Sequence, residues 1–265
     1  MISLASGTIY CEYILNGKPP ILLIHGFVSS TYTFKRITSL LQKKFSVIAV
    51  DLLGFGQSEK STTFIYSYTN YAALVAEIIG YFKLKNVTIV GHSMGGQIAL
   101  YAARKIPQKI DKLILLASSG YLKSANKFMI LSTYLPFFYL FAKHKVQRQD
   151  VEDTLKNVLY NQSLLTRELI EVYGRPLKEK NFYKSLIRLL RYREGDLSSA
   201  QLQEIKIPTL LLWGVEDKVV PLSIGERLIK DLPNASLITY GQTGHLITEE
   251  RPTEVYEQII SFTQN

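Results

Sequence analysis

The sequence predicts an α/β protein with a doubly wound, mostly parallel sheet and an inserted helical cap. Short runs of continuous apolar residues, typical of strands buried on both faces, alternate with helical patterns. A Gly-x-Ser-x-Gly motif joins one of these strands to a helix rich in small residues. The alternation stops between residues 121 and 202, where the apolar spacing is helical and no convincing central strand occurs.

Before the motif, turn signals separate the expected elements. Asn16-Gly17 marks a turn between the first two strands. Apolar residues recur at i, i+3, i+4 and i+7 from residue 71, which predicts an amphipathic helix. The expected strands lie at 8–15, 21–24 and 47–50, and the expected helices at about 31–43 and 71–82.

After the motif, the same repetition resumes on either side of the insertion. The expected strands lie at 113–117, 209–213 and 236–240, with helices at about 223–232 and from 253 onward. Strand–helix–strand units of this kind build a doubly wound sheet through right-handed crossovers. We therefore expect residues 1–120 and 203–265 to form the core and residues 121–202 to form the cap.

The positive charge is concentrated in the insertion. The whole chain has a formal net charge of +9, and residues 121–195 carry 14 Lys and Arg against 7 Asp and Glu. The favoured interpretation is that these basic residues form a solvated helical face. Attraction to anionic substrates or to an anionic membrane surface is the alternative. No motif of a nucleic-acid-binding module accompanies the basic residues, so no nucleic-acid partner is expected.

Composition indicates a protein of the cytoplasm with a large core. The chain has 265 residues, 47% of them hydrophobic, and its N-terminus shows no secretory signal. The longest apolar stretch, 128–142, contains Pro136 and is too short to span a bilayer. Cys11 is the only cysteine and cannot form an internal disulfide. No metal-ligand cluster and no nucleotide-binding glycine motif occurs, so no metal and no cofactor is expected.

Ser93 is the candidate nucleophile. It lies within Gly91-His92-Ser93-Met94-Gly95, between the strand and the helix. Glycines flank the serine because side chains there would collide across the tight turn that holds the nucleophile in a strained conformation. The motif alone occurs by chance in many proteins, but in this strand-to-helix context it indicates a hydrolase.

A serine hydroxyl needs a base to take its proton, and His245 is the candidate. It lies in a glycine-rich loop after the last strand, at the carboxyl edge of the sheet. His25 directly follows a strand, His92 should point away from the nucleophile, and His144 lies in the basic insertion.

The base in turn needs a carboxylate, which fixes its tautomer. Asp217 follows a strand and is preferred over its neighbour Glu216. The chain order Ser93, Asp217, His245 is the nucleophile–acid–base order of this type of sheet.

Five short segments occur together in an order that is highly specific. They are His25-Gly26-Phe27, residues 51–58, residues 91–96, residues 214–217 and Gly244-His245. With these segments the chain resembles the α/β-hydrolase fold superfamily, in particular its compact serine esterases, lipases and C–C hydrolases.

The resemblance implies an oxyanion hole formed by the backbone N–H groups of Phe27 and Met94, each contributing about 3 kcal/mol. His25 would then shape that loop. Epoxide hydrolases and haloalkane dehalogenases of this fold carry an aspartate at the position of Ser93, so alkyl-enzyme chemistry is not expected. Asp51, Gly54 and Gly56 are interpreted as residues of a tight loop after a buried strand. Cap aromatics such as Phe128, Phe137 and Phe138 are candidates for the roof of an acyl pocket.

The expected function is hydrolysis of small to medium apolar carboxylic esters through an acyl-enzyme. The same three residues could instead serve C–C, thioester or amide hydrolysis, because an oxyanion hole accepts any carbonyl. A slow-turnover small-molecule sensor that acts through a protein partner is an alternative of another class. A lipase at the membrane surface, using residues 128–141 with Lys143 and Lys145, is a further one.

Overall fold

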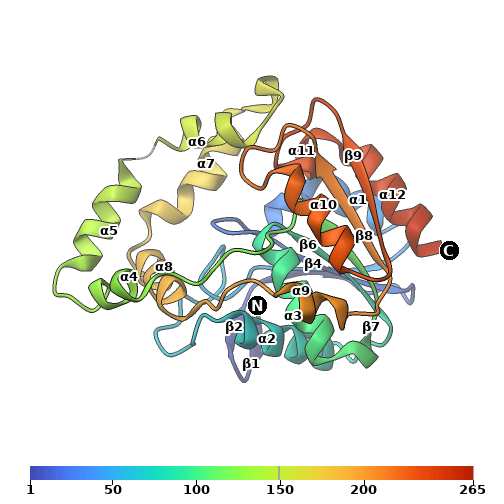
Figure 1. The fold of residues 1–265 in the computed structure, drawn as a ribbon, viewed down its shortest axis with the longest axis horizontal. Coiled ribbons are helices and arrows are strands. Elements are labelled where there is room, and N and C mark those ends of the chain that lie inside the picture. Colours follow the sequence, from blue (N-terminus) through green and yellow to red (C-terminus); the bar gives the residue numbers. More distant parts are fainter. Residues whose placement is uncertain (149, 265) are drawn as a thin grey trace.

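The computed structural model describes residues 1–148 and 150–264, and a seven-stranded sheet forms its centre (Figure 1). The strands are β3 (Cys11–Ile14), β4 (Pro20–Ile24), β5 (Ser46–Val50), β6 (Val87–His92), β7 (Ile110–Leu116), β8 (Thr209–Gly214) and β9 (Ala235–Tyr240). Their order is β3-β5-β4-β6-β7-β8-β9, with β3 antiparallel to β5 and all other neighbours parallel. The predicted doubly wound, mostly parallel sheet is confirmed.

Helices cover both faces of the sheet. One face packs against η1 (Thr31–Phe34), α1 (Lys35–Leu41), α11 (Ile247–Glu250) and α12 (Pro252–Gln264). The other packs against α2 (Tyr68–Tyr81), α3 (Met94–Lys105), α9 (Ser199–Gln203) and α10 (Leu222–Asp231). In β4, Ile21 and Leu23 join the first core and Leu22 joins the second. Strands buried on both faces therefore appear as continuous apolar runs in the sequence.

The predicted strand at 8–15 is wrong in one respect, because the chain changes sheets at Tyr10. β2 (Gly7–Ile9) pairs with β1 (Ile2–Leu4) in a separate two-stranded sheet, and only β3 joins the main sheet. The Tyr10 N–H donates to Ser58 Oγ at 2.8 Å instead of to a strand neighbour. This side-chain acceptor comes from a distant loop, so no local pattern could reveal the break.

The chain between β7 and β8 is helical, as predicted. It contains α4 (Lys127–Ser132), α5 (Phe138–Gln147), α6 (Val151–Val158), η3 (Gln162–Leu164), α7 (Arg167–Gly174), η4 (Arg175–Lys178) and α8 (Lys180–Tyr192), followed by α9. In Figure 1 most of these helices lie to the left of the sheet, with α4 and α5 farthest from it. The predicted boundary at residue 202 falls inside α9, whose Leu202 packs in the same core as Leu228 of α10.

Two further sequence features can be placed. Cys11 is a buried free thiol in β3. Of the helices in the described residues, none is both long enough and apolar enough to cross a membrane.

The loop after β5 is held by the buried carboxylate of Asp51. Its Oδ1 accepts from the Thr31 N–H and its Oδ2 from the Gln57 N–H, both at 2.7 Å. A Cβ on Gly56, which has φ +48°, would lie 2.0 Å from the Asp51 carboxylate. Asp51 therefore connects the 51–58 loop to the loop after β4, which agrees with its interpretation as a tight-loop residue.

Asp51→Asn should destabilise the protein, because an amide offers one acceptor oxygen to two backbone N–H groups, of which that of Thr31 is buried. The expected loss in the free energy of unfolding is about 1–3 kcal/mol, measured by urea denaturation. Asp111→Asn, at an exposed position, is the matched control and should leave stability near the wild-type value. Equal stability of the two variants would contradict the anchoring role.

Candidate active site

Ser93 sits on a strained turn between β6 and α3. Its backbone has φ 53° and ψ −119°, a conformation that L-residues rarely adopt. A Cβ on Gly91 would lie 2.4 Å from the Gly95 carbonyl oxygen, and one on Gly95 would lie 2.2 Å from the Ile24 carbonyl oxygen. The turn can therefore form only with glycine at positions 91 and 95, as expected from the sequence.

Hydrogen bonds fix the backbone of Ser93 on both sides. Its N–H donates to the Leu116 carbonyl at 2.9 Å, and its carbonyl accepts from the Ser119 N–H at 3.0 Å. These bonds connect the turn to the end of β7 and the residues that follow it. The position of the serine is thus set by the sheet rather than by a mobile loop.

His245 and Asp217 meet at the carboxyl edge of the sheet. His245 Nδ1 lies 2.7 Å from Asp217 Oδ2, and both side chains are almost fully buried. The other oxygen, Asp217 Oδ1, accepts from the N–H groups of Val219 and Val220 at 2.8 and 2.9 Å. These two backbone N–H groups therefore orient the Asp217 carboxylate independently of its contact with the imidazole.

Glu216, the rejected alternative, holds the loop that leads to His245. Its Oε2 accepts from the Thr243 N–H at 3.0 Å, and backbone donors of this kind lower the pKa of the Glu216 carboxyl. A Cβ on Gly214 would lie 2.3 Å from the carbonyl oxygens of Thr243 and Gly244. The chain after β8 and the loop after β9 are therefore packed tightly together, and Asp217 alone of the two acids contacts the imidazole.

His92 has a contact that the sequence analysis missed. The side chain is buried, its Nε2 lies 2.9 Å from the His245 carbonyl oxygen, and the two rings are 4.8 Å apart. Burial, and then the nearby His245, lowers the pKa of His92 to about 3. The neutral ring therefore carries its hydrogen on Nε2 and donates it to the His245 backbone. The partners are 153 residues apart, so the sequence held no signal for this contact.

The other two histidines are placed as expected. His25 Nδ1 donates to the Gly26 carbonyl at 2.7 Å, and its Nε2 accepts from the Leu52 N–H at 2.9 Å. Both ring nitrogens are thus used by backbone groups, and burial lowers the pKa of His25. His144 is exposed on α5.

Ser93 and His245 line the same cavity, which has a volume of about 350 Å³. Its walls are largely apolar and come mainly from the helical insertion: Val146, Val151, Leu155, Val158, Leu177 and Leu186. Phe128, Phe137 and Phe138 do not line this cavity, and Phe128 and Phe137 are 85% and 78% exposed. The pocket roof expected from these three aromatics is supplied by smaller aliphatic side chains.

Of the two residues expected to supply the oxyanion hole, Met94 directly follows Ser93 and Phe27 directly follows Gly26. Met94 is the first residue of α3, so its N–H has no acceptor within the helix. Phe27 follows β4 and lines the cavity. A Cβ on Gly26 would lie 3.0 Å from the Ser93 Cβ, so this turn lies directly against the serine.

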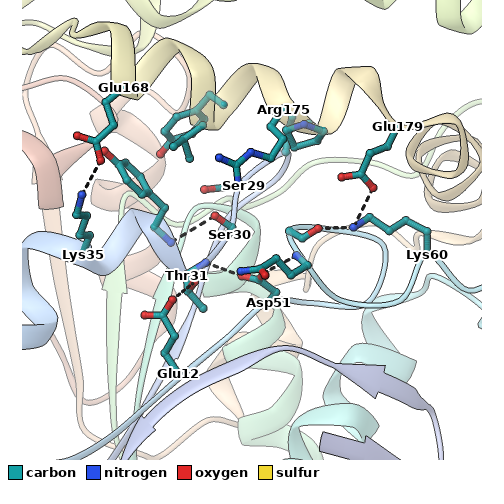
Figure 2. Close-up of a pocket in the computed structure, with 17 residues that line it drawn as sticks. Glu12, Ser29, Ser30, Thr31, Lys35, Asp51, Lys60, Glu168, Arg175 and Glu179 are labelled. Carbon is teal, nitrogen blue, oxygen red and sulfur yellow. Dashed lines mark hydrogen bonds and ion pairs between the residues drawn. The ribbon is translucent and has the colours of Figure 1, made fainter. Parts of the chain in front are cut away.

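A second, polar cavity of about 630 Å³ is shown in Figure 2. It adjoins the first cavity and shares Val28, Ser29 and Tyr173 with it. Ion pairs cross it between the sheet-bearing body and the insertion: Lys35 with Glu168 at 2.6 Å, and Lys60 with Glu179 at 3.2 Å. Such partly exposed pairs contribute about 0–1 kcal/mol each. Their main consequence is to connect α7 with the start of α1, and the residue after η4 with Lys60.

Within the described residues, no group of three or more His, Cys, Asp or Glu side chains is arranged to hold a metal ion.

Comparisons with known proteins agree on the family. The family model described as alpha/beta hydrolase fold matches residues 19–252. YugF of Bacillus subtilis, described as an uncharacterized hydrolase, is 46% identical over 255 residues, which cover 96% of this chain and 93% of YugF.

Two solved structures share the fold at lower identity. A meta-cleavage product hydrolase from Pseudomonas fluorescens superposes with a TM-score of 0.82 at 22% identity, covering 99% of this chain and 96% of that one. An esterase from Exiguobacterium antarcticum gives a TM-score of 0.80 at 23% identity, covering 100% and 98%. The family match, the close relative and the shared fold establish that this chain belongs to the α/β-hydrolase fold family.

Proposed function

We propose that this protein is a serine hydrolase that cleaves carboxylic esters with small to medium apolar acyl groups. The observation that carries the proposal is the His245–Asp217 contact of 2.7 Å beside a cavity that Ser93 also lines. A buried imidazole held by an oriented carboxylate is what a serine nucleophile requires. The aliphatic walls favour an apolar acyl group in the cavity.

The mechanism proceeds in two halves. Ser93 Oγ attacks the ester carbonyl carbon while His245 Nε2 takes its proton, and the oxyanion accepts from the N–H groups of Phe27 and Met94. When this tetrahedral intermediate collapses, the bond between the carbonyl carbon and the alcohol oxygen breaks, and the alcohol oxygen receives that proton from His245. Water then gives a proton to His245 and attacks the acyl-enzyme, releasing the acid and returning the proton to Ser93 Oγ. Asp217 stabilises the transient imidazolium in both halves.

Ser93→Ala should abolish ester hydrolysis. Loss of the nucleophile is expected to lower kcat for p-nitrophenyl butyrate by on the order of 10⁵–10⁶-fold. A fluorophosphonate should label wild-type protein once, at Ser93, as read by peptide mass spectrometry. Ser119→Ala, which removes the hydroxyl of another buried serine, is the control. An active, labelled Ser93→Ala variant would overturn the assignment.

The pair Asp217→Asn and Glu216→Gln should separate the two adjacent acids. Asp217→Asn keeps the shape but leaves the imidazole without its carboxylate, so kcat should fall by about 10⁴-fold. Glu216→Gln retains an acceptor for the Thr243 N–H and should retain most activity. Steady-state kinetics on the same ester measures both. The reverse ranking of the variants would reassign the acid to Glu216.

His92 fits a positioning role in this mechanism, because its N–H holds the His245 backbone. His92→Gln can still donate to that carbonyl, whereas His92→Leu cannot, so kcat should fall further in His92→Leu, by about tenfold from one lost buried hydrogen bond.

A second readout of the His92 variants is acid sensitivity. Unfolding raises the pKa of His92 from about 3 to its ordinary value near 6.5, so the unfolded chain takes up a proton between these pH values and folding weakens as pH falls. His92→Gln should therefore lose about 2 kcal/mol less stability than wild type between pH 7 and pH 5, by urea denaturation. Parallel loss in both proteins would contradict a buried neutral His92.

A further inference from the structure

Large apolar side chains are unusually exposed on α4, α5 and the turn between them. Six of them, here called the α4–α5 surface, are at least 58% exposed: Phe128, Leu131, Tyr134, Leu135, Phe137 and Phe141. Elsewhere in the described residues, only Met1 among the large hydrophobic side chains reaches that exposure. A concentration of this kind, in contrast to scattered surface leucines, indicates a surface that contacts something apolar.

The charge on the chain segment that carries the α4–α5 surface has a single sign. Residues 121–148 contain five Lys and Arg and no Asp or Glu. The five cations, Lys123, Lys127, Lys143, Lys145 and Arg148, make no ion pair within residues 1–148 and 150–264. They lie on the same two helices and on the chain just before and after them. Apolar side chains framed by unpaired cations match the two components of an anionic bilayer surface, its headgroups and its acyl region.

The opposite side of α5 belongs to the catalytic cavity. Val146 lines that cavity, and Tyr139 packs edge-to-face against Tyr183 of α8 at 6.2 Å. Neither α4 nor α5 contributes a fully buried residue to the core. In Figure 1 the two helices lie at the far left edge, away from the sheet. A lipid surface in contact with α4 and α5 would therefore lie one helix away from the cavity.

We propose that the α4–α5 surface docks the protein onto an anionic lipid bilayer. The charge distribution favours a bilayer over a second copy of this chain, because a two-fold interface would place the unpaired cations of both copies together. Docking goes beyond the proposed esterase activity and does not depend on it, because the six apolar residues lie outside the catalytic cavity.

Cosedimentation with vesicles tests the proposal directly. Wild-type protein should bind vesicles of phosphatidylcholine mixed with phosphatidylglycerol at low salt, and bind much less to phosphatidylcholine alone. Binding should weaken as salt is raised, because mobile ions screen the attraction. Leu131→Ser with Leu135→Ser, and Lys127→Glu with Lys145→Glu, should each lower the partition coefficient at least about tenfold.

Matched controls separate the surface from general effects. Ile14→Ser with Leu15→Ser removes exposed apolar side chains elsewhere, and Lys85→Glu with Lys109→Glu makes the same charge change at exposed positions away from α4 and α5. Both controls should bind near the wild-type level. Ser93→Ala should bind like wild type, so that a failed esterase assignment and a failed docking surface give different results. Far-UV circular dichroism and urea denaturation show that each surface variant is folded, whether or not it hydrolyses an ester.

Three results would overturn the proposal. The first is no binding of wild type to anionic vesicles at low salt. The second is equal loss of binding in the surface and control charge reversals, which would indicate net charge alone. The third is a wild-type dimer, seen by light scattering and lost in Leu131→Ser with Leu135→Ser, without vesicle binding; the surface would then join two copies of the chain.

Discussion

The close backbone packing around Ser93 is the constraint on which the rest of the site depends. The turn can form only because Gly91 and Gly95 leave room for a carbonyl of the turn itself and for one of β4. Hydrogen bonds from the Ser93 backbone to the end of β7 and to Ser119 then fix the serine relative to the sheet. Once Ser93 is fixed in this way, His245 has to be brought to it by other segments.

Three separate contacts hold His245. His92 donates to the His245 backbone, Asp217 binds the His245 ring, and Val158 of α6 accepts from the His245 N–H at 2.8 Å. The end of β6, the loop after β8 and the helical insertion thus all contact one residue. Because His92 directly precedes Ser93, one turn of chain positions both Ser93 and the backbone of His245.

The sequence predicted the sheet and the turn that holds Ser93 because their signals are local. The apolar runs reflect burial of the strands on both faces of the sheet. The glycines on either side of Ser93 are required by contacts within the turn and with the adjacent strand, so a short motif is enough to reveal them. The break at Tyr10 and the role of His92 could not be predicted, because each depends on a partner far along the chain. The prediction of the residues that line the pocket was wrong for a different reason. Composition identified an apolar insertion, but it could not indicate which side of each helix faces the cavity.

That last distinction divides the insertion into two parts. Leu155 of α6 and Leu169 of α7 pack against Leu246, next to His245, and ion pairs connect α7 and Glu179, the residue after η4, to the core. Helices α6 and α7 are therefore packed against the loop that carries His245, and moving them would move His245. Helices α4 and α5 have no such buried anchor, and their apolar side chains lie mostly in solvent. Burying those side chains in another phase would gain hydrophobic free energy without disturbing the His245 loop, so this part of the insertion is the one suited to meet a surface.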